Sequence, residues 1–145
     1  MRNRIRVMHG VNLDVLDRRP SAHYGELSLT RLEQKIEAFA RDAGLEPTFF
    51  QTNHEGEFVE ELHKAHDLCD GLILNPGAWT HYAWAIRDAL EISGLPAIEV
   101  HLSDVDAREE FRKVSVIRDL CRGTVSGRGV EGYEDAVRML EEALA

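Results

Sequence analysis

Tyr24 and Arg19 lie close together in a polar stretch near the start of the chain, and this pair could act as a base. A free phenol titrates at about pH 10, and a guanidinium that keeps its proton favours the phenolate form of a neighbouring tyrosine. A phenolate can remove a proton bound to carbon. The same residues could instead be a packed loop tyrosine and a solvated arginine, and the pattern alone leaves both interpretations open.

Glu99 and His101 are two residues apart in a short apolar run that predicts a strand. Residues at this spacing share one face of a strand, so the carboxylate can orient the imidazole as a general acid. A buried structural ion pair would have the same spacing, and this alternative stays open. Leu102 and Ser103 come next, at a predicted helix start whose backbone amides would attract a carboxylate, with Arg112 as a helper.

Three further motifs allow a structural explanation beside a functional one. Asn75, in the turn Asn75-Pro76-Gly77-Ala78, could bind a hydroxyl group or could only turn the chain. His63 and His66 share a helix face but have no third ligand in pattern, so we expect surface residues and no metal site. The segment 127–132 matches the glycine pattern of dinucleotide-binding loops. It lacks the following strand and acidic residue, so we interpret it as a tight turn.

The elements that must position these residues alternate between strands and helices. Apolar runs predict strands at 5–8, 48–50, 72–74, 97–100 and 124–125, and one-sided apolar spacing predicts helices at 29–43, 58–69, 81–93, 103–111 and 133–144. The segment 12–25 has turn-forming residues without a period, which predicts a loop. Thr30 and Glu33 are spaced for a capping box, and Thr80 is placed to cap the helix at 81–93.

This alternation predicts an α/β fold with a five-stranded parallel sheet covered on both faces. The expected topology is a flavodoxin-like three-layer sandwich with strand order 2-1-3-4-5, and we expect residues 1–145 to form one catalytic domain. Ligands of such sheets bind beyond the carboxyl ends of the strands. The polar residues expected there are His9, Asn12, Asn53, His54, Asn75, His101 and Ser103, with Arg19, Tyr24, His81, Arg108 and Arg112 on neighbouring segments. This mixture favours a small anionic ligand.

The composition narrows the classes of function. The chain has 145 residues, of which 43% are hydrophobic and 30% are charged, which indicates a globular protein with enough material for a core. Its net charge of −9 has the wrong sign for a nucleic-acid partner. Cys69 and Cys121 form neither metal-ligand spacing nor a disulfide framework, and no apolar stretch reaches the roughly 18 residues of a membrane span. We therefore expect a cytoplasmic protein without a membrane partner.

Taken as a set, the polar motifs resemble those of type II 3-dehydroquinate dehydratase in order and spacing. The matching residues are Asn12-Leu13, Arg19, Tyr24-Gly25, Asn53-His54-Glu55-Gly56, Asn75-Pro76-Gly77-Ala78, Thr80-His81, Arg87-Asp88-Ala89, Glu99-Val100-His101-Leu102-Ser103, Ala107-Arg108-Glu109, Phe111-Arg112 and Gly132-Tyr133. They extend over nearly the whole chain, and their combination is specific although each fragment alone is not.

The resemblance implies dehydration of 3-dehydroquinate to 3-dehydroshikimate, in the shikimate or quinate pathway, by an enzyme without a cofactor. Tyr24 as a phenolate, stabilised by Arg19, would remove a proton beside the ketone. Asn12 would stabilise the resulting enolate through a bound water, and His101, oriented by Glu99, would protonate the departing hydroxyl group.

The resemblance also implies the substrate-binding residues and the assembly. The implied binding residues are Leu102 and Ser103 for the carboxylate, Asn75, His81 and Arg112 for ring hydroxyls, and Asp88 for a neighbouring subunit's site. The family's subunits pack as trimers that assemble into a dodecamer. The segment with Arg19 and Tyr24 is expected to close over the substrate and exclude water.

This chain departs from the family pattern at a few positions. The family usually has Asn-Gly-Pro-Asn where this chain has His9-Gly10-Val11-Asn12, and glycine where Asp17 stands. These changes could alter turnover or substrate choice, although the catalytic positions remain. Two alternatives stay open: a related dehydratase of another cyclic hydroxy-keto acid, and a non-catalytic flavodoxin-like module that binds a small acid.

Overall fold

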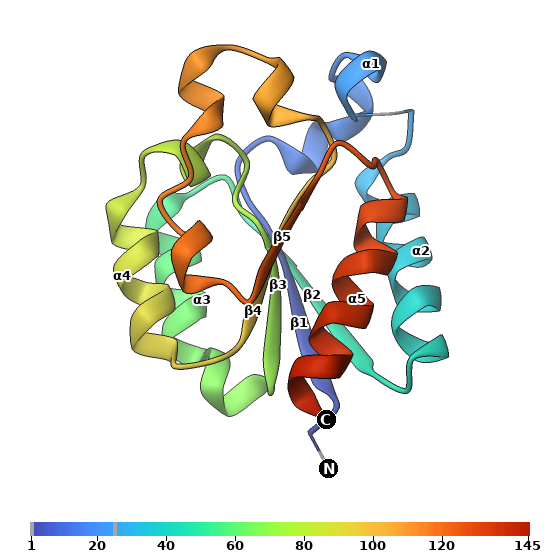
Figure 1. Cartoon of the computed structure of the whole chain (residues 1–145), viewed down its shortest axis with the longest axis vertical. Helices are drawn as coiled ribbons and strands as arrows, with labels where there is room; N and C mark the ends of the chain where they lie inside the picture. Colours follow the sequence, from blue (N-terminus) through green and yellow to red (C-terminus); the bar gives the residue numbers. More distant parts are fainter. Residues whose placement is uncertain (1, 25) are drawn as a thin grey trace.

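The computed structural model describes residues 2–24 and 26–145, so Gly25 of the sequence motif lies outside the described residues. Five strands form one sheet (Figure 1). They are β1 (Arg4–His9), β2 (Glu46–Gln51), β3 (Gly71–Asn75), β4 (Ala97–His101) and β5 (Gly123–Ser126). All pairings are parallel and the order is β2-β1-β3-β4-β5, which confirms the predicted α/β fold with strand order 2-1-3-4-5.

Helices cover both faces of this sheet (Figure 1). Helices α2 (Leu29–Asp42) and α5 (Glu131–Leu144) lie on one face, and α3 (Glu55–Leu68) and α4 (Trp84–Ser93) lie on the other. Successive strand residues point to opposite faces, so Val7 packs in the core under α2 and α5 while Met8 packs in the core under α3 and α4. Strands β3 and β4 are buried along their whole length, as expected for parallel strands covered on both sides.

Gly10 lies where the loop after β1 touches the turn after β3. A Cβ at this position would lie 2.2 Å from the carbonyl oxygen of Pro76, so no other residue fits without a backbone shift. The Gly10 amide donates to the carbonyl of Asn75 at 2.8 Å. This close approach fixes the spacing between two segments that carry predicted site residues.

The segment after β1 differs from the loop that the sequence predicts. It contains a 3-10 helix, η1 (Leu13–Arg18), and a single helical turn, α1 (Ser21–Tyr24). Leu13 and Leu16 are buried and join the core under α2 and α5. Because Leu13 and Leu16 are buried by contacts with distant parts of the chain, no local periodicity of apolar residues predicts these helical turns.

The predicted capping box of α2 is wrong. The cap is Ser28, whose hydroxyl accepts a hydrogen bond from the Arg31 amide at 3.3 Å, so Thr30 does not start the helix. Glu33 is therefore free for another contact, and its carboxylate lies 3.1 Å from Nε2 of His9.

Two more predicted helix starts are wrong. Helix α4 begins at Trp84 after a 3-10 turn, η2 (Gly77–His81), and Thr80 bonds to Glu99 instead of capping α4. The predicted helix at 103–111 is replaced by two 3-10 turns, η3 (Val105–Ala107) and η4 (Glu110–Lys113). The carboxylate of Asp104 caps η3.

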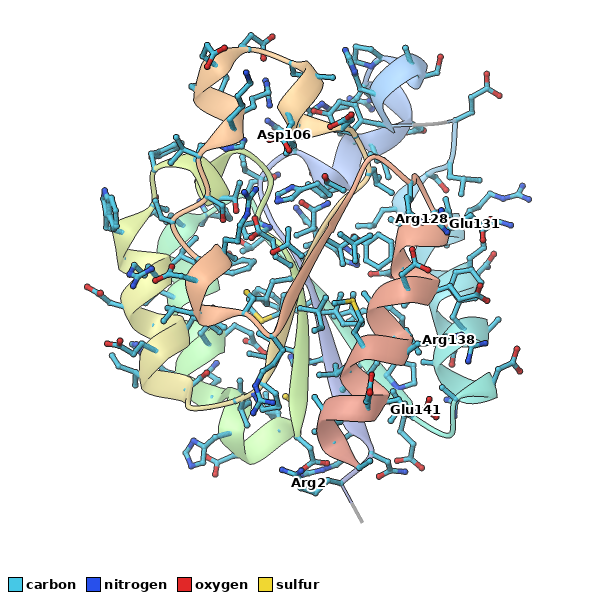
Figure 2. All side chains as sticks on the ribbon, viewed as in Figure 1. Arg2, Asp106, Arg128, Glu131, Arg138 and Glu141 are labelled. Carbon is cyan, nitrogen blue, oxygen red and sulfur yellow. The ribbon has the colours of Figure 1, made fainter. Side chains whose placement is uncertain are left out.

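The two ends of the sheet differ. Figure 2 shows Asp106 at the carboxyl end, where the loop after β4 and the segment after β1 come together, and Arg2 at the opposite end. There the Arg2 guanidinium lies 3.4 Å from the carbonyl of Leu144. Within residues 2–24 and 26–145, no helix has the length and apolar character to cross a membrane.

Candidate active site

A pocket lies beyond the carboxyl ends of β3 and β4. Its walls come from the segment after β1, the turn after β3 and the loop after β4, and it is lined by Leu13, Arg19, Tyr24, Asn75, Gly77, Ala78, His81, His101, Leu102, Ser103, Val105, Arg108 and Arg112. Among the residues to which the family resemblance gives a catalytic or binding role, only Asn12, Glu99 and Asp88 are absent from the lining. His9, Asn53 and His54, which were expected at the same strand ends, are absent from it too. Three arginines in the lining make the pocket suited to an anion, although the whole chain carries a net charge of −9.

Tyr24 is held between two guanidinium groups. Its hydroxyl oxygen accepts hydrogen bonds from Arg19 at 2.5 Å and from Arg108 at 2.6 Å. The Arg19 guanidinium carbon also lies 4.0 Å from the centre of the Tyr24 ring. The two guanidinium groups place positive charge directly at this oxygen, where it could offset a negative charge.

Arg108 lines the pocket and contacts Tyr24, although the sequence predicted for it only a place near the strand ends. It lies 84 residues from Tyr24 in the chain, and the same guanidinium nitrogen also contacts Oγ of Ser103 at 3.3 Å. Its only sequence signal was the motif Ala107-Arg108-Glu109 of the family resemblance.

Glu99 and His101 form a buried pair, as the strand spacing predicts. Nε2 of His101 lies 2.6 Å from a Glu99 carboxylate oxygen, and Glu99 is fully buried. The carboxylate also accepts from Thr80 at 2.5 Å and from Ser115 at 2.8 Å. Burial alone would raise the pKa of Glu99, but the hydrogen bond and charge of His101, with the two hydroxyl donors, outweigh it and lower that pKa.

The Glu99 contacts settle how the imidazole of His101 is oriented. Because the carboxylate can only accept, Nε2 carries a proton, and Nδ1 is the ring nitrogen left for other partners. His101 lines the pocket while Glu99 lies behind it. This arrangement fits an oriented acid better than a purely structural ion pair. Thr80 and Ser115, which anchor Glu99, were not predicted because hydroxyl contacts across 19 and 16 residues leave no pattern in the sequence.

His81 stands beside His101 with their rings nearly parallel, 6.4 Å apart at an angle of 17°. Burial lowers the pKa of His81, and the positive charges of His101 and Arg112 act in the same direction. The Val114 carbonyl, which lies 2.6 Å from Nδ1, opposes them. Because a carbonyl can only accept, Nδ1 holds the proton and Nε2 can accept a hydrogen bond from a ligand hydroxyl.

The segment after β4 is fixed by its backbone. The carbonyls of Leu102 and Ser103 accept from the amides of Gly129 and Gly127 at 3.1 and 3.0 Å. The expected helix start is wrong here, since only the three-residue turn η3 follows. Positive charge near Ser103 comes instead from Arg108 and Arg112, of which Arg112 also pairs with Glu109.

The comparisons with known proteins agree with this geometry. The family model Dehydroquinase class II matches residues 3–141. The 3-dehydroquinate dehydratase of Pelobacter propionicus is 47% identical over 142 residues, which are 97% of this chain and 95% of that protein. The chain belongs to the type II 3-dehydroquinate dehydratase family. The resemblance found in the sequence is thereby confirmed.

Solved structures support the same assignment. The type II dehydroquinase from Butyrivibrio crossotus is similar with a TM-score of 0.91 and 40% identity, over 96% of this chain and 97% of that one. A 3-dehydroquinate dehydratase-like protein from Bifidobacterium longum is similar with a TM-score of 0.72 and 28% identity, over 98% of both chains. The likeness to the first covers nearly the full length of both chains.

Some predicted residues lie outside the pocket. Asn12 is exposed and has a left-handed backbone conformation with φ of 70°. Its backbone N–H donates a hydrogen bond to Oδ1 of Asn53 at 2.8 Å. Asn53 and His54 are exposed and do not line the pocket, so only part of the expected convergence at the strand ends occurs. Asp88 is exposed on α4.

The turn at Asn75 and the histidine pair on α3 were the motifs with two possible explanations. Asn75 lines the pocket, and its Oδ1 accepts from the Gly77 amide at 3.1 Å, so this side chain serves the turn and the pocket together. His63 and His66 are exposed on α3, as predicted. Across the described residues, no group of three or more His, Cys, Asp or Glu side chains is arranged to hold a metal ion.

Proposed function

We propose that this pocket binds 3-dehydroquinate and converts it to 3-dehydroshikimate, with Tyr24 as the base and His101 as the acid. Membership of the family makes the chain a type II 3-dehydroquinate dehydratase of the shikimate pathway. The observation that carries the assignment of roles is the pair of arginine donors at the Tyr24 oxygen. No other phenol lines this pocket, among the residues that the structure describes.

In the first step the Tyr24 phenolate takes a proton from the carbon next to the ketone. The C–H electron pair moves toward the ketone oxygen and gives an enolate. Arg19 and Arg108 donate hydrogen bonds to the phenolate oxygen before the transfer and stabilise its negative charge. Asn12, acting through a bound water, is the proposed partner of the enolate oxygen. Its exposed position requires the segment after β1 to close over the substrate.

In the second step the enolate expels the hydroxyl group as the C–O bond breaks. His101 donates a proton from Nδ1, so the leaving group departs as water. Glu99 fixes the ring and stabilises the positive charge that His101 carries before this transfer. Exchange with solvent returns a proton to His101 and removes one from Tyr24, which closes the cycle.

The remaining pocket residues would hold the substrate. The backbone and hydroxyl of Ser103, with the backbone of Leu102, are the proposed carboxylate site. Asn75, Nε2 of His81 and Arg112 are the proposed partners of ring hydroxyls. The positive charge of Arg112 and Arg108 in the same pocket would also favour an acid over a neutral cyclic ketone.

We also propose that the chain works as a homo-oligomer of trimers that assemble into a dodecamer. The outer face of α4 presents Trp84 and Ile92, which are 64% and 70% exposed, on either side of Asp88. Apolar side chains of this size on one helix face favour a partner surface. Asp88 is exposed and does not line the pocket of its own chain, so it is available to a neighbouring subunit. Sedimentation that gives a stable, fully active monomer would contradict this assembly.

We further propose that residues 1–145 form one catalytic domain that works in the cytoplasm. Cys69 and Cys121 are free, and burial raises the pKa of their thiols to about 11 and about 12. Such thiols are unreactive near neutral pH, which suits a structural role in a reducing compartment.

The activity test follows the ultraviolet absorbance of the conjugated product when the protein meets 3-dehydroquinate, with a metal chelator present. Wild type should raise the absorbance, and Tyr24→Phe should lower kcat by about 10²–10⁴-fold while its thermal unfolding stays unchanged. Tyr82→Phe, at an exposed tyrosine on the surface, is the matched control. Turnover only of a ring analogue would favour a related dehydratase. Binding without turnover would favour a non-catalytic module.

A further inference from the structure

Between η4 and β5 the chain runs through residues 114–119, which we call the strap. The strap includes the start of a 3-10 turn, η5 (Arg118–Leu120), and passes beside α4 as the orange segment of Figure 1. Its residues Val116 and Ile117 are buried in the core under α3 and α4. Apolar packing has no preferred direction, so it holds the strap near α4 without setting how its polar groups point.

Two polar groups of the strap act on the histidines of the pocket. The Val114 carbonyl lies 2.6 Å from Nδ1 of His81 and keeps the ring proton on that nitrogen. The Ser115 hydroxyl lies 2.8 and 3.0 Å from the two carboxylate oxygens of Glu99, which in turn orients His101. One short segment therefore orients both the proposed acid and a proposed substrate-binding residue.

The direction of the Ser115 hydroxyl is set by the backbone of the strap. Its oxygen accepts hydrogen bonds from the amides of Ile117 and Arg118 at 3.3 and 3.1 Å. Because these amides occupy the lone pairs of the oxygen, its single proton is left for Glu99. The donor stays on the carboxylate only while residues 115–118 keep their turn.

Arg87 on α4 bonds to the strap at two places. One terminal nitrogen of its guanidinium donates to the Val116 carbonyl at 2.8 Å and to the Asp119 carboxylate at 2.5 Å. The other terminal nitrogen donates to the second Asp119 oxygen at 2.9 Å. A planar guanidinium on a carboxylate has a fixed orientation, and this orientation also fixes the donor at Val116. The bonds therefore hold the backbone on either side of the Ser115 turn.

The exposure of this pair argues against a purely stabilising role. The Arg87 side chain is 26% exposed and that of Asp119 is 67% exposed. Ion pairs with a partner so open to solvent contribute little to the free energy of unfolding, because water and salt screen them. Their geometry can still set the direction of a segment that the buried side chains already hold close.

We propose that Arg87 is a positioning residue that holds the strap against the acid pair and His81. Arg87 does not line the pocket, so it acts without touching the substrate. The inference rests on the proposed roles of His101 as the acid and His81 as the partner of a ring hydroxyl. Without Arg87, the Ser115 hydroxyl would move away from Glu99, and the strap carbonyl would release the ring of His81.

The first test measures kcat and KM for 3-dehydroquinate in Arg87→Gln and Ser115→Ala, alone and combined. We expect Arg87→Gln to lower kcat about threefold to tenfold through Glu99 and to raise KM about twofold to fivefold through His81. In the Ser115→Ala background, Arg87→Gln should lower kcat by less than about twofold but should still raise KM. General loosening of the fold would not separate the two constants in this way.

Arg4 offers a matched control at the opposite end of the sheet. Its guanidinium also forms a fork with a carboxylate, that of Asp70, and also reaches a backbone carbonyl, that of Asp67. Arg4→Gln should leave kcat and KM unchanged. If Arg87→Gln fails to fold, Asp119→Asn carries the test, since this exposed side chain can lose its charge without leaving a cavity. Its effects should have the same direction and be smaller.

The second test needs no substrate. Burial lowers the pKa of His81, so its ring is uncharged near neutral pH, and ¹⁵N chemical shifts then show which nitrogen holds the proton. Wild type and Arg4→Gln should show the proton on Nδ1, and Arg87→Gln should show a mixture of the two forms.

The outcomes separate this inference from the proposed function. An unchanged His81 spectrum in Arg87→Gln, or a loss in kcat that is the same with and without Ser115, would overturn the positioning role. Wild type that does not turn over 3-dehydroquinate would overturn the proposed function, and the His81 spectrum would still decide whether Arg87 positions the strap.

Discussion

The acid side of the pocket is built into the sheet, whereas the base side stands on short helical turns outside it. Glu99 and His101 belong to β4, and Thr80 and Ser115 hold the carboxylate from two further segments. Tyr24 ends the single turn α1, is only partly buried and packs against the edge of the core under α2 and α5.

The difference shows two ways of placing a catalytic group. A buried carboxylate with several donors needs no rearrangement when the substrate arrives, which is the condition for effective orientation of an acid. A base on a segment that closes over the substrate, as proposed for Tyr24, would let the substrate enter and then exclude water. We call the segment 12–24 the lid, and β4 with the residues that bond to Glu99 the sheet side. On this account, substitutions on the sheet side should affect folding and catalysis together, and substitutions on the lid side should affect catalysis alone.

The largest effect after loss of Tyr24 is expected from His101→Ala. Removing the proton donor should lower kcat by about 10²–10⁴-fold, because the hydroxyl group would have to leave without protonation. Steady-state kinetics with 3-dehydroquinate would measure this. A variant with kcat within a few-fold of wild type would show that another group supplies the proton.

Next in size are the two arginines at the Tyr24 oxygen. Arg19→Ala and Arg108→Ala should each lower kcat/KM by about tenfold to a hundredfold, since each removes a charge-assisted hydrogen bond to the base. Thermal unfolding should not change, in contrast to variants on the sheet side. The control is Arg138→Ala on the outer face of α5 (Figure 2), where the side chain is exposed. Equal losses in that control would point to a general charge effect.

Thr80→Val tests the sheet side with a smaller change. It leaves Glu99 with one hydroxyl donor fewer, so we expect a cost in unfolding free energy of about 1–3 kcal/mol at pH 7 together with a loss of about tenfold in kcat. Ser103→Ala, which removes a hydroxyl from the pocket lining without touching Glu99, is the comparison. It should change KM while leaving stability close to wild type.

The stability cost of Thr80→Val should depend on pH. Because the pKa of Glu99 is lower in the folded state, its contribution is fully present above the unfolded pKa of about 4.5 and is lost as the pH falls through the folded value. The difference between wild type and Thr80→Val should therefore shrink below about pH 4.5. Denaturant unfolding at several pH values would show this, and a difference that grows toward low pH would contradict the lowered pKa.

How far the sequence predicts the molecule also differs between the two sides. The apolar runs of β3 and β4 and the two-residue spacing of Glu99 and His101 are local patterns, so the sheet and the acid pair could be predicted. The approach of Arg108 to Tyr24 across 84 residues depends on the path of two loops, and no local pattern encodes such a path. The pair Arg19 and Tyr24 suggested a base from the sequence, but a packed loop tyrosine stayed open, and only the family resemblance favoured the catalytic interpretation.

The smallest predicted effect concerns the lid itself. Binding of a non-reacting cyclic acid should slow tryptic cleavage after the exposed Arg18 several-fold, because closure over the ligand would shield this site. Limited proteolysis with and without ligand would measure it. Identical cleavage rates would show that the segment does not close and would leave the exposed Asn12 without its proposed role.

The most direct test of the central claim, that proton removal and hydroxyl loss belong to different sides of the pocket, is hydrogen exchange of 3-dehydroquinate in D₂O. Mass spectrometry or NMR would follow deuterium at the carbon beside the ketone for Tyr24→Phe and His101→Ala. The account predicts that His101→Ala still incorporates deuterium while forming little product, and that Tyr24→Phe does neither. Incorporation by Tyr24→Phe at the rate of His101→Ala would contradict the assignment of the base.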